Sequence, residues 1–569
     1  MVLAAFIFAG TISLFAQSAF DSTFNNEAGM VREHLEVFTD RSIYVINERI
    51  RFRADHRVEG LEGEMPWSTI LYAELVSASG QVLKGSKYPL VEGVGRGSLV
   101  IPSDVLTGHY YLKCYTRWMR NRGPASFSYL PIRIINPFKT EVAAYSNGNN
   151  GIVQFDSTRY MRGLLGIENP MVEPGPNGEV SFHLSLPNTG YPESLNCCVT
   201  IVPVGAIDTL NGIITQAESG SGTPGFSINY LPEIDGISLS GRVVHPDGTP
   251  APFTRVHFSM LGEDQDFFTT ITDGHGRFVI STPDRAGDRE LFVVPESPGE
   301  NRVEVRIDQD FDQGKLRLPE QEFRLSDLER EVATQLAIRM QLARIFKERQ
   351  GEEPLITDSI KEVAIPFYGT PAFRLEMHEY VNLPSLEEVF INLVPDVFVL
   401  KKRGRKLFKI NSDNSAIGIF PTLIMIDYIP VFDQEAVMAL EPEKIRRIDM
   451  INEVYVKGDI SFGGVISIFS LKGDMAGIDL APGSYFFDFQ SLEPVTLERP
   501  GQPEPGDRIP DTRNTLLWLD DVSVEQGSSV EFRCKAPDQP GDYLVFVRGV
   551  TKQGRVHSAT ARFRISGLF

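Results

Sequence analysis

Residues 421–431 read PTLIMIDYIPV, residues 440–449 read LEPEKIRRID, and residues 458–474 read GDISFGGVISIFSLKGD. Leu423–Asp427 is a short apolar run closed by an acidic residue, a pattern that predicts a buried strand. Pro442 stands at the start of a predicted helical turn, a position that proline favours. Ile445–Asn452 and Val465–Leu471 are predicted to be further strands. We therefore expect a small α+β module over residues 380–475.

The quoted stretch resembles the plug domain of TonB-dependent outer-membrane receptors. One position departs from that family, which usually has glycine after the aspartate of its Ile-Asp-Gly-x-Pro turn. Here Asp427 is followed by Tyr428. We therefore expect either a different turn at this point or a tyrosine in a strained backbone conformation.

The number of residues after this stretch determines which functions we expect. Only about 95 residues follow Asp474. A 22-stranded barrel at roughly 10 residues per strand needs more than about 220 residues before loops are counted. We therefore expect a plug-like module without its barrel, which points to an envelope binding or assembly protein and away from a transporter or an enzyme.

A second resemblance lies near the start of the chain, where alternating segments such as Ile50–Ala54 predict a β-sandwich over residues 33–138. Its motifs are Thr39-Asp40-Arg41-x-x-Tyr44, the run YTRWMR at 115–120 and the run IINPF at 134–138. They resemble the macroglobulin-type domain of the alpha-2-macroglobulin superfamily, in the version common in Bacteroidetes envelope proteins. Residues 140–215 are predicted to form a second sandwich of this type.

Residues 236–310 are predicted to form a smaller sandwich, with a hairpin turn at Asp247-Gly248. The segment resembles the carboxypeptidase regulatory-like domain, a transthyretin-like fold. The positions that match that family's motif are Gly241, Val243, Asp247, Gly248, Pro250, Asp273, Gly276 and Phe278. The resemblance implies a spacer without peptidase chemistry.

Two further units complete the predicted organisation. Residues 325–350 read as one long helix, with Ser326 and Glu329 placed as a capping box. Its apolar residues at helical spacing are Leu328, Val332, Leu336, Met340 and Ala343. Residues 514–569 alternate like a final sandwich. Segments rich in glycine, proline, serine or charge at 216–233 and 499–513 are predicted linkers.

Composition and the N-terminal segment indicate where the protein resides and which classes of partner it can bind. The net charge of −20 argues against a nucleic-acid partner, because phosphate binding needs a basic face. Residues 1–17 read as a secretory signal peptide, too short to span a bilayer, and no other segment is long and apolar enough to do so. The cysteines lack paired metal-ligand spacing, so we expect buried free thiols, although a disulfide stays open in an exported chain. They are Cys114, Cys197, Cys198 and Cys534.

Motifs of catalysis are missing from the sequence. It has no HExxH pair, no nucleophile elbow, no P-loop and no macroglobulin thioester sequence Cys-Gly-Glu-Gln. His245, His257 and His275 all lie in the predicted small sandwich. We interpret them as ordinary surface histidines on strands and turns, and a metal cluster is the less favoured alternative. The basic run KKRGRK at 401–406 is predicted to be a solvated hairpin tip, with lipid headgroups or an acidic partner as the alternative contact. We assign no catalytic, cofactor-binding or metal-binding residue and expect no cofactor.

Together these patterns predict a mostly β, multidomain exported protein of a Gram-negative envelope, in the periplasm or at the outer membrane. Its expected partner is an outer-membrane or periplasmic protein, with a β-barrel as one candidate. Two alternatives stay open. One is a barrel-less relative or fragment of a TonB-dependent nutrient receptor. The other is an enzyme of unrecognised type, which a pocket gathering two or more titratable groups would indicate.

Overall fold

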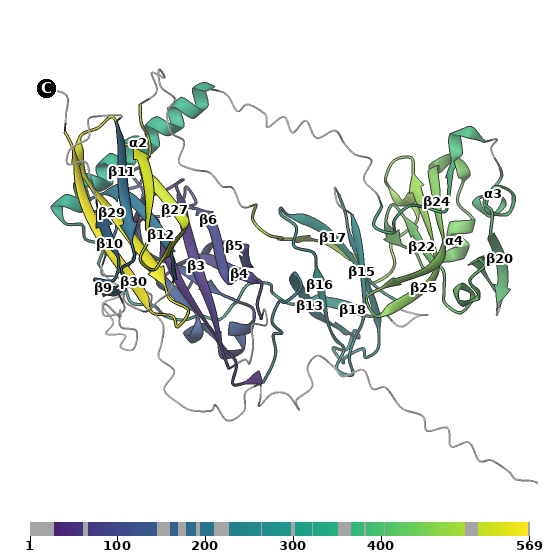
Figure 1. Ribbon diagram of the computed structural model, residues 1–569. Helices are drawn as coiled ribbons and strands as arrows, with labels where there is room; N and C mark the ends of the chain where they lie inside the picture. Colours follow the sequence, from purple (N-terminus) through teal and green to yellow (C-terminus); the bar gives the residue numbers. More distant parts are fainter. Residues whose placement is uncertain are drawn as a thin grey trace, which may run out of the picture.

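The computed structural model shows a chain built mostly from β-strands, which form three sandwiches and a small α+β module (Figure 1). The predicted fold class is therefore confirmed. The predicted signal peptide, residues 1–17, lies outside the described residues. Most of the predicted linkers at 216–233 and 499–513 lie outside them too. The structure describes residues 28–60, 67–144, 160–168, 178–188, 194–209, 227–262, 265–296, 302–320, 322–350, 366–380, 383–402, 404–494 and 510–566.

The first sandwich contains β1 (Arg32–Thr39), β2 (Ile43–Val45), β3 (Arg49–Glu59), β4 (Ile70–Ser77), β5 (Val82–Val91), β6 (Val94–Val100), β7 (Gly108–Tyr115) and β8 (Ser128–Ile135). They pair in the order β1-β3-β6-β5-β4-β7-β8-β2. β5 pairs with β4 through most of its length and with β6 through Leu90 and Val91, so the sheet bends over at this strand. The two layers thereby enclose one core.

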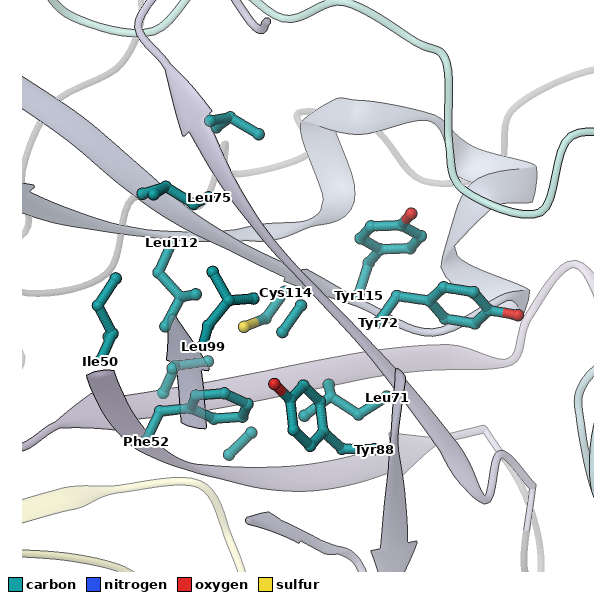
Figure 2. Packing of buried hydrophobic residues seen from close by; sticks show 14 of the residues in the cluster. Ile50, Phe52, Leu71, Tyr72, Leu75, Tyr88, Leu99, Leu112, Cys114 and Tyr115 are labelled. Carbon is teal, nitrogen blue, oxygen red and sulfur yellow. The ribbon is translucent and has the colours of Figure 1, made fainter. Parts of the chain in front are cut away.

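Aromatic and aliphatic side chains fill the core of the first sandwich (Figure 2). Ile50, Phe52 and Ala54 are fully buried, which confirms the alternation predicted for that strand. The rings of Phe52 and Tyr88 meet edge to face at 4.9 Å, and the Tyr88 hydroxyl donates a 2.6 Å hydrogen bond to the carbonyl of Ser98. A buried tyrosine is tolerated here because its polar end has a partner.

A composite sandwich is assembled from two distant parts of the chain. Its strands are β9 (Tyr160–Arg162), β10 (Gly166–Glu168), β11 (Glu179–Ser185), β12 (Ser194–Pro203), β27 (Leu517–Glu525), β28 (Ser529–Lys535), β29 (Gly541–Val550) and β30 (Val556–Ile565). β28 pairs with β11, and β12 lies between β27 and β29. The prediction of separate sandwiches at 140–215 and 514–569 is therefore wrong. β28 completes the sheet of β11, and β12 separates β27 from β29, so neither half forms its sheets without the other.

The small sandwich contains β13 (Ile237–Val244), β14 (Arg255–Met260), β15 (Asp266–Ile271), β16 (Arg277–Thr282), β17 (Arg289–Pro295), β18 (Glu304–Ile307) and β26 (Tyr485–Phe489). The sheets are β16-β13-β18 and β15-β14-β17-β26. β26 lies outside the predicted range of 236–310, because it returns after the α+β module and pairs with β17. The small sandwich thus holds both chain segments that flank that module.

The α+β module, residues 366–478, has a mixed sheet in the order β19-β24-β25-β22-β23 and a separate hairpin, β20-β21. β22 and β25 pair in parallel, and the other neighbours pair antiparallel. The strands are β19 (Phe373–Glu376), β20 (Val397–Lys402), β21 (Arg405–Ile410), β22 (Leu423–Ile426), β23 (Ile429–Pro430), β24 (Ile445–Lys457) and β25 (Ile460–Ser470). The helices are α3 (Leu386–Leu393) and α4 (Gln434–Met438). The predicted small mixed sheet is observed, and the helical turn at Pro442–Lys444 is a 3-10 turn.

Helix α2 (Asp327–Gln350) packs against β2 of the first sandwich and approaches the composite sandwich. Ser326 and Glu329 form the predicted capping box, with the Ser326 amide donating to the Glu329 carboxylate at 2.8 Å. Leu336 is fully buried, whereas Leu328 is exposed and does not belong to the packed face. None of the described helices combines the length and apolar character that a membrane crossing requires.

The four cysteines are free and buried, as expected. Cys197 and Cys198 lie in β12, Cys114 in β7 and Cys534 in β28. Burial raises the pKa of the Cys534 thiol to about 12, so this thiol is protonated and unreactive at neutral pH.

Candidate functional site

The turn between β22 and β23 shows how the chain accommodates Tyr428 at the position where glycine was expected. Ile426 and Ile429 pair across it, and Asp427 and Tyr428 have φ angles of 49° and 67°. Two successive left-handed residues are typical of a two-residue type I′ hairpin turn, which fits the twist of paired strands. The tight turn thus places a tyrosine in a backbone conformation that favours glycine, at a strain of about 1 kcal/mol or more.

The Asp427 side chain ties this turn to the end of β25. Its carboxylate accepts hydrogen bonds from the Ser470 amide at 2.9 Å, the Ser470 hydroxyl at 2.6 Å and the Met475 amide at 3.0 Å. Three donors converge on one carboxylate, so Asp427 is a structural anchor of the module.

Tyr428 contacts aromatic side chains on one side and the small sandwich on the other. Its ring lies edge to face on Phe469 at 5.2 Å and packs near Phe367 at 5.8 Å. Its carbonyl accepts a 2.8 Å hydrogen bond from the Ser259 hydroxyl of β14. Burial raises the pKa of the Tyr428 phenol. The packing offsets the backbone strain and fixes the module against the small sandwich.

An aromatic junction joins the α+β module to the small sandwich. The rings of His257 and Phe267 stack at 5.8 Å within the small sandwich, and Phe462 of β25 lies 6.2 Å from Phe267. Lys457 forms a 2.7 Å ion pair with Asp266 beside these rings. This face of the module is therefore covered.

The three histidines of the small sandwich do not converge. His257 is buried in β14, where desolvation lowers its pKa, while His245 and His275 lie in turns. In the part of the chain that the structure describes, no group of three His, Cys, Asp or Glu side chains is placed to hold a metal ion.

The β20-β21 hairpin lies at the end of the module away from the small sandwich (Figure 1). Helix α4 covers the outer edge of β21 with two side chains. Gln434 accepts a 2.7 Å hydrogen bond from the Phe408 amide, and Glu435 accepts a 3.0 Å hydrogen bond from the Lys406 amide. Neither residue was predicted to be part of a site. Asp433, which caps α4, was a local signal for the helix but not for its contact with β21.

The predicted basic run lies at this hairpin. Lys401, Lys402 and Arg405 are exposed, whereas Lys406 forms a 2.6 Å ion pair with Glu387 of α3. Apolar side chains are exposed at the same end. Phe398 and Leu400 of β20 are 41% and 45% exposed. The tip is solvated as predicted, and it stands beside an apolar surface that the sequence analysis did not identify.

The Thr39–Tyr44 motif lies at the junction of the first and composite sandwiches. The Tyr44 hydroxyl donates to Asp40 Oδ1 at 2.7 Å, and Thr515 Oγ1 donates to Asp40 Oδ2 at 2.6 Å. Arg41 pairs with Glu48 at 3.0 Å. Asp40, Arg41 and Tyr44 are buried, and the Thr515 contact links them across the junction, so the motif holds two sandwiches together.

A second buried polar junction joins the first sandwich to the small sandwich. Glu233 accepts hydrogen bonds from the Tyr72 hydroxyl at 3.0 Å and the Ser238 amide at 2.7 Å. Desolvation raises the pKa of Glu233 to about 7. Nearby, Lys87 is fully buried and forms an ion pair with Asp310. The polar network orients the two sandwiches relative to one another.

A cavity of about 480 Å³ gathers titratable side chains between β7, β8 and the start of α2, among them His109, Arg133, Glu322 and Glu329. Arg133 forms a 2.6 Å ion pair with Glu329, and Glu329 also caps α2. Desolvation lowers the pKa of His109. A pocket with several titratable groups is what the enzyme alternative called for, but Glu329 in this cavity already makes two structural contacts, the ion pair with Arg133 and the cap of α2.

These features define a class: a modular protein of linked β-sandwiches that carries a small α+β module at one end. No known family model matches the chain. No curated protein sequence matches it either.

Solved structures of bacterial macroglobulins are similar to this chain at low identity. Escherichia coli alpha-2-macroglobulin activated by porcine elastase is 10% identical, with 94% of this chain and 44% of that chain covered and a TM-score of 0.24. Salmonella alpha-2-macroglobulin reacted with methylamine is 8% identical, with 94% and 40% covered and a TM-score of 0.23. Dimeric latent PorU from Porphyromonas gingivalis is 11% identical, with 49% and 33% covered and a TM-score of 0.16. This chain spans less than half the length of those macroglobulins.

Proposed function

We propose that this chain is a non-catalytic binding or assembly protein of a Gram-negative cell envelope. The sandwiches act as a scaffold, and the α+β module docks to an outer-membrane or periplasmic protein. The resemblance of residues 380–475 to receptor plugs favours an outer-membrane β-barrel as the partner class.

One observation carries the proposal. The module is covered on one side by the aromatic junction with the small sandwich, while its opposite end exposes Phe398 and Leu400. Exposed apolar side chains gathered at one end of a module are typical of protein docking surfaces. The scaffold holds this end away from the composite sandwich (Figure 1).

Site-specific photo-cross-linking in the native host tests the proposal. A photoreactive phenylalanine analogue replaces Phe398 in one variant and Phe138, which is 58% exposed on the first sandwich, in the matched control. We expect the Phe398 variant to form a discrete adduct with one envelope protein that the Phe138 variant does not form. Equal adducts from both positions, or purification from outer membranes without an attached partner, would contradict the proposal.

The nutrient-receptor alternative makes a different prediction. A transport-associated relative would act together with a separately encoded barrel, so deletion of this chain would impair uptake of a particular nutrient. An assembly protein would instead change the amount of its partner in the envelope. Quantifying both in the deletion strain separates the two functions.

A further inference from the structure

The register of the β20-β21 hairpin shows which backbone groups are uncovered. Val399 lies opposite Phe408, and Lys401 lies opposite Lys406. The amides of Phe408 and Lys406 point away from β20, because they donate to side chains of α4. Opposite residues of an antiparallel pair either both exchange hydrogen bonds or both face outward. The amides and carbonyls of Val399 and Lys401 therefore face away from β21.

Helix α3 lies close to β20 and contacts the hairpin from its inner face. Phe390 of α3 packs on Phe408 at 4.5 Å, on the inner face of the hairpin. In the part of the chain that the structure describes, no hydrogen-bond partner lies beyond β20 for the amides of Val399 and Lys401. β20 is thus an open edge, whereas the outer edge of β21 is covered by Gln434 and Glu435.

The side chains around the open edge define its partner. Phe398 and Leu400 are exposed on the outer face, and this part of β20 carries none of the charges that usually protect an edge strand against association. Lys401, Lys402 and Arg405 are exposed at the tip, and the described residues provide them with no ion pair. A cationic tip on a chain of net charge −20 is complementary to an acidic ligand.

We propose that the outer edge of β20 binds an extended acidic segment of a partner protein as an added strand. The partner backbone pairs with Val399 and Lys401, its apolar residues contact Phe398 and Leu400, and its carboxylates lie against the basic tip. This inference rests on the proposed docking function and specifies the ligand of the docking surface. A lipid surface is a poorer candidate because it has no peptide backbone to pair with the edge. A second copy of β20 is also a poorer candidate, because it would bring another basic tip and no carboxylates to neutralise the first.

Binding of a defined peptide to the full chain tests the proposal. The probe is a short fluorescein-labelled peptide that alternates valine and glutamate, measured by fluorescence anisotropy at low salt. We expect saturable binding that weakens as salt rises. We expect at least about tenfold weaker binding for a peptide with lysine in place of glutamate, and for one whose alternate amides are methylated.

Two variants test the edge itself. Val399→Pro removes an outward amide that donates nothing to β21, so we expect at least about tenfold weaker peptide binding and only the modest fall in melting temperature that loss of the Val399 side-chain packing brings. Val399→Thr keeps the amide and should bind like the natural chain. Lys401→Glu with Lys402→Glu should abolish the preference for the acidic peptide, whereas the exposed pair Lys84→Glu with Lys552→Glu should retain it.

The outcomes separate this inference from the proposed function. If Val399→Pro binds the peptide normally, the edge does not bind strands. If Val399→Pro converts a dimer into a monomer, the occupant is a second copy of the chain and the acidic-partner inference fails. If the Phe398 cross-link to an envelope protein survives in the Val399→Pro background at full yield, the docking function stands and the added-strand mode is overturned.

Discussion

The Thr515 hydroxyl donates a 2.6 Å hydrogen bond to Oδ2 of Asp40, although 475 residues separate the two in sequence. The contact joins the first sandwich to the segment that opens the second half of the composite sandwich. Asp40 also accepts from the Tyr44 hydroxyl, so a motif that resembles macroglobulin sequences serves here to join domains.

Thr515→Val removes this hydrogen bond while keeping the side-chain shape. We expect a loss of about 2 kcal/mol of unfolding free energy, because the buried carboxylate loses one donor. The measurement is calorimetric unfolding of the full chain. Thr334→Val is the matched control, since the Thr334 hydroxyl donates on the exposed surface of α2. Equal effects of the two substitutions would show that the junction contact contributes no more than a surface one.

The stability of the junction at Glu233 should fall as pH rises. The folded-state pKa of about 7 lies above the ordinary glutamate value of 4.5. The folded state therefore holds a proton that the unfolded state releases, and this contribution is present at low pH and lost as pH rises from 4.5 through 7. Glu233→Gln mimics the protonated form. We expect Glu233→Gln to melt at a higher temperature than the natural chain above pH 7, with the difference shrinking toward pH 5.

The control for this pH dependence is Glu331→Gln, a change at an exposed position of α2. Its melting temperature should follow that of the natural chain across the same range. A Glu233→Gln variant with an unchanged pH profile would mean that Glu233 is ionised in the folded protein.

Tyr428→Gly compares backbone strain with ring packing. Glycine relieves about 1 kcal/mol of strain at the positive φ angle, whereas loss of the packed ring removes about 2 kcal/mol. We expect a net loss of about 1 kcal/mol, measured by thermal unfolding. Tyr428→Phe keeps the ring and should be nearly neutral. A stabilised Tyr428→Gly would show that the strain outweighs the aromatic contacts with Phe367 and Phe469.

Truncation after residue 494 tests the composite sandwich. The shortened chain keeps β26 but loses β27, β28, β29 and β30, so β12 loses both neighbours and β11 loses β28. We expect the amides of β11 and β12 to lose protection in hydrogen exchange. Those of β22 and β25, whose neighbours all remain, should keep it. Unchanged protection in β12 would indicate that the predicted sandwich over residues 140–215 folds without the C-terminal strands.

Features that depend on neighbours in sequence were predicted well. The alternating segment Ile50–Ala54 was predicted as a strand and lies within β3. The Ser326 and Glu329 capping box was also predicted. Both features could be predicted because apolar alternation and a helix cap each depend on residues within a few positions of one another.

Features that depend on distant pairing were missed. Nothing within β26 marks it as a partner of β17, and nothing within residues 514–569 marks them as half of a sandwich begun at residue 160. At the candidate site, the basic tip was visible in the sequence. The open edge was not, because it depends on Gln434 and Glu435 covering one strand of the hairpin and leaving the other uncovered.

The amino-acid order alone determined the strand-rich class, the positions of individual strands and caps, and the basic hairpin tip, since these follow from side-chain pattern and local backbone preference. Only the tertiary structure decided which strands share a sheet, which buried charges join the domains, and which edge stays free. Those outcomes arise because a sheet places residues hundreds of positions apart within hydrogen-bond distance, and no short segment encodes its distant neighbour.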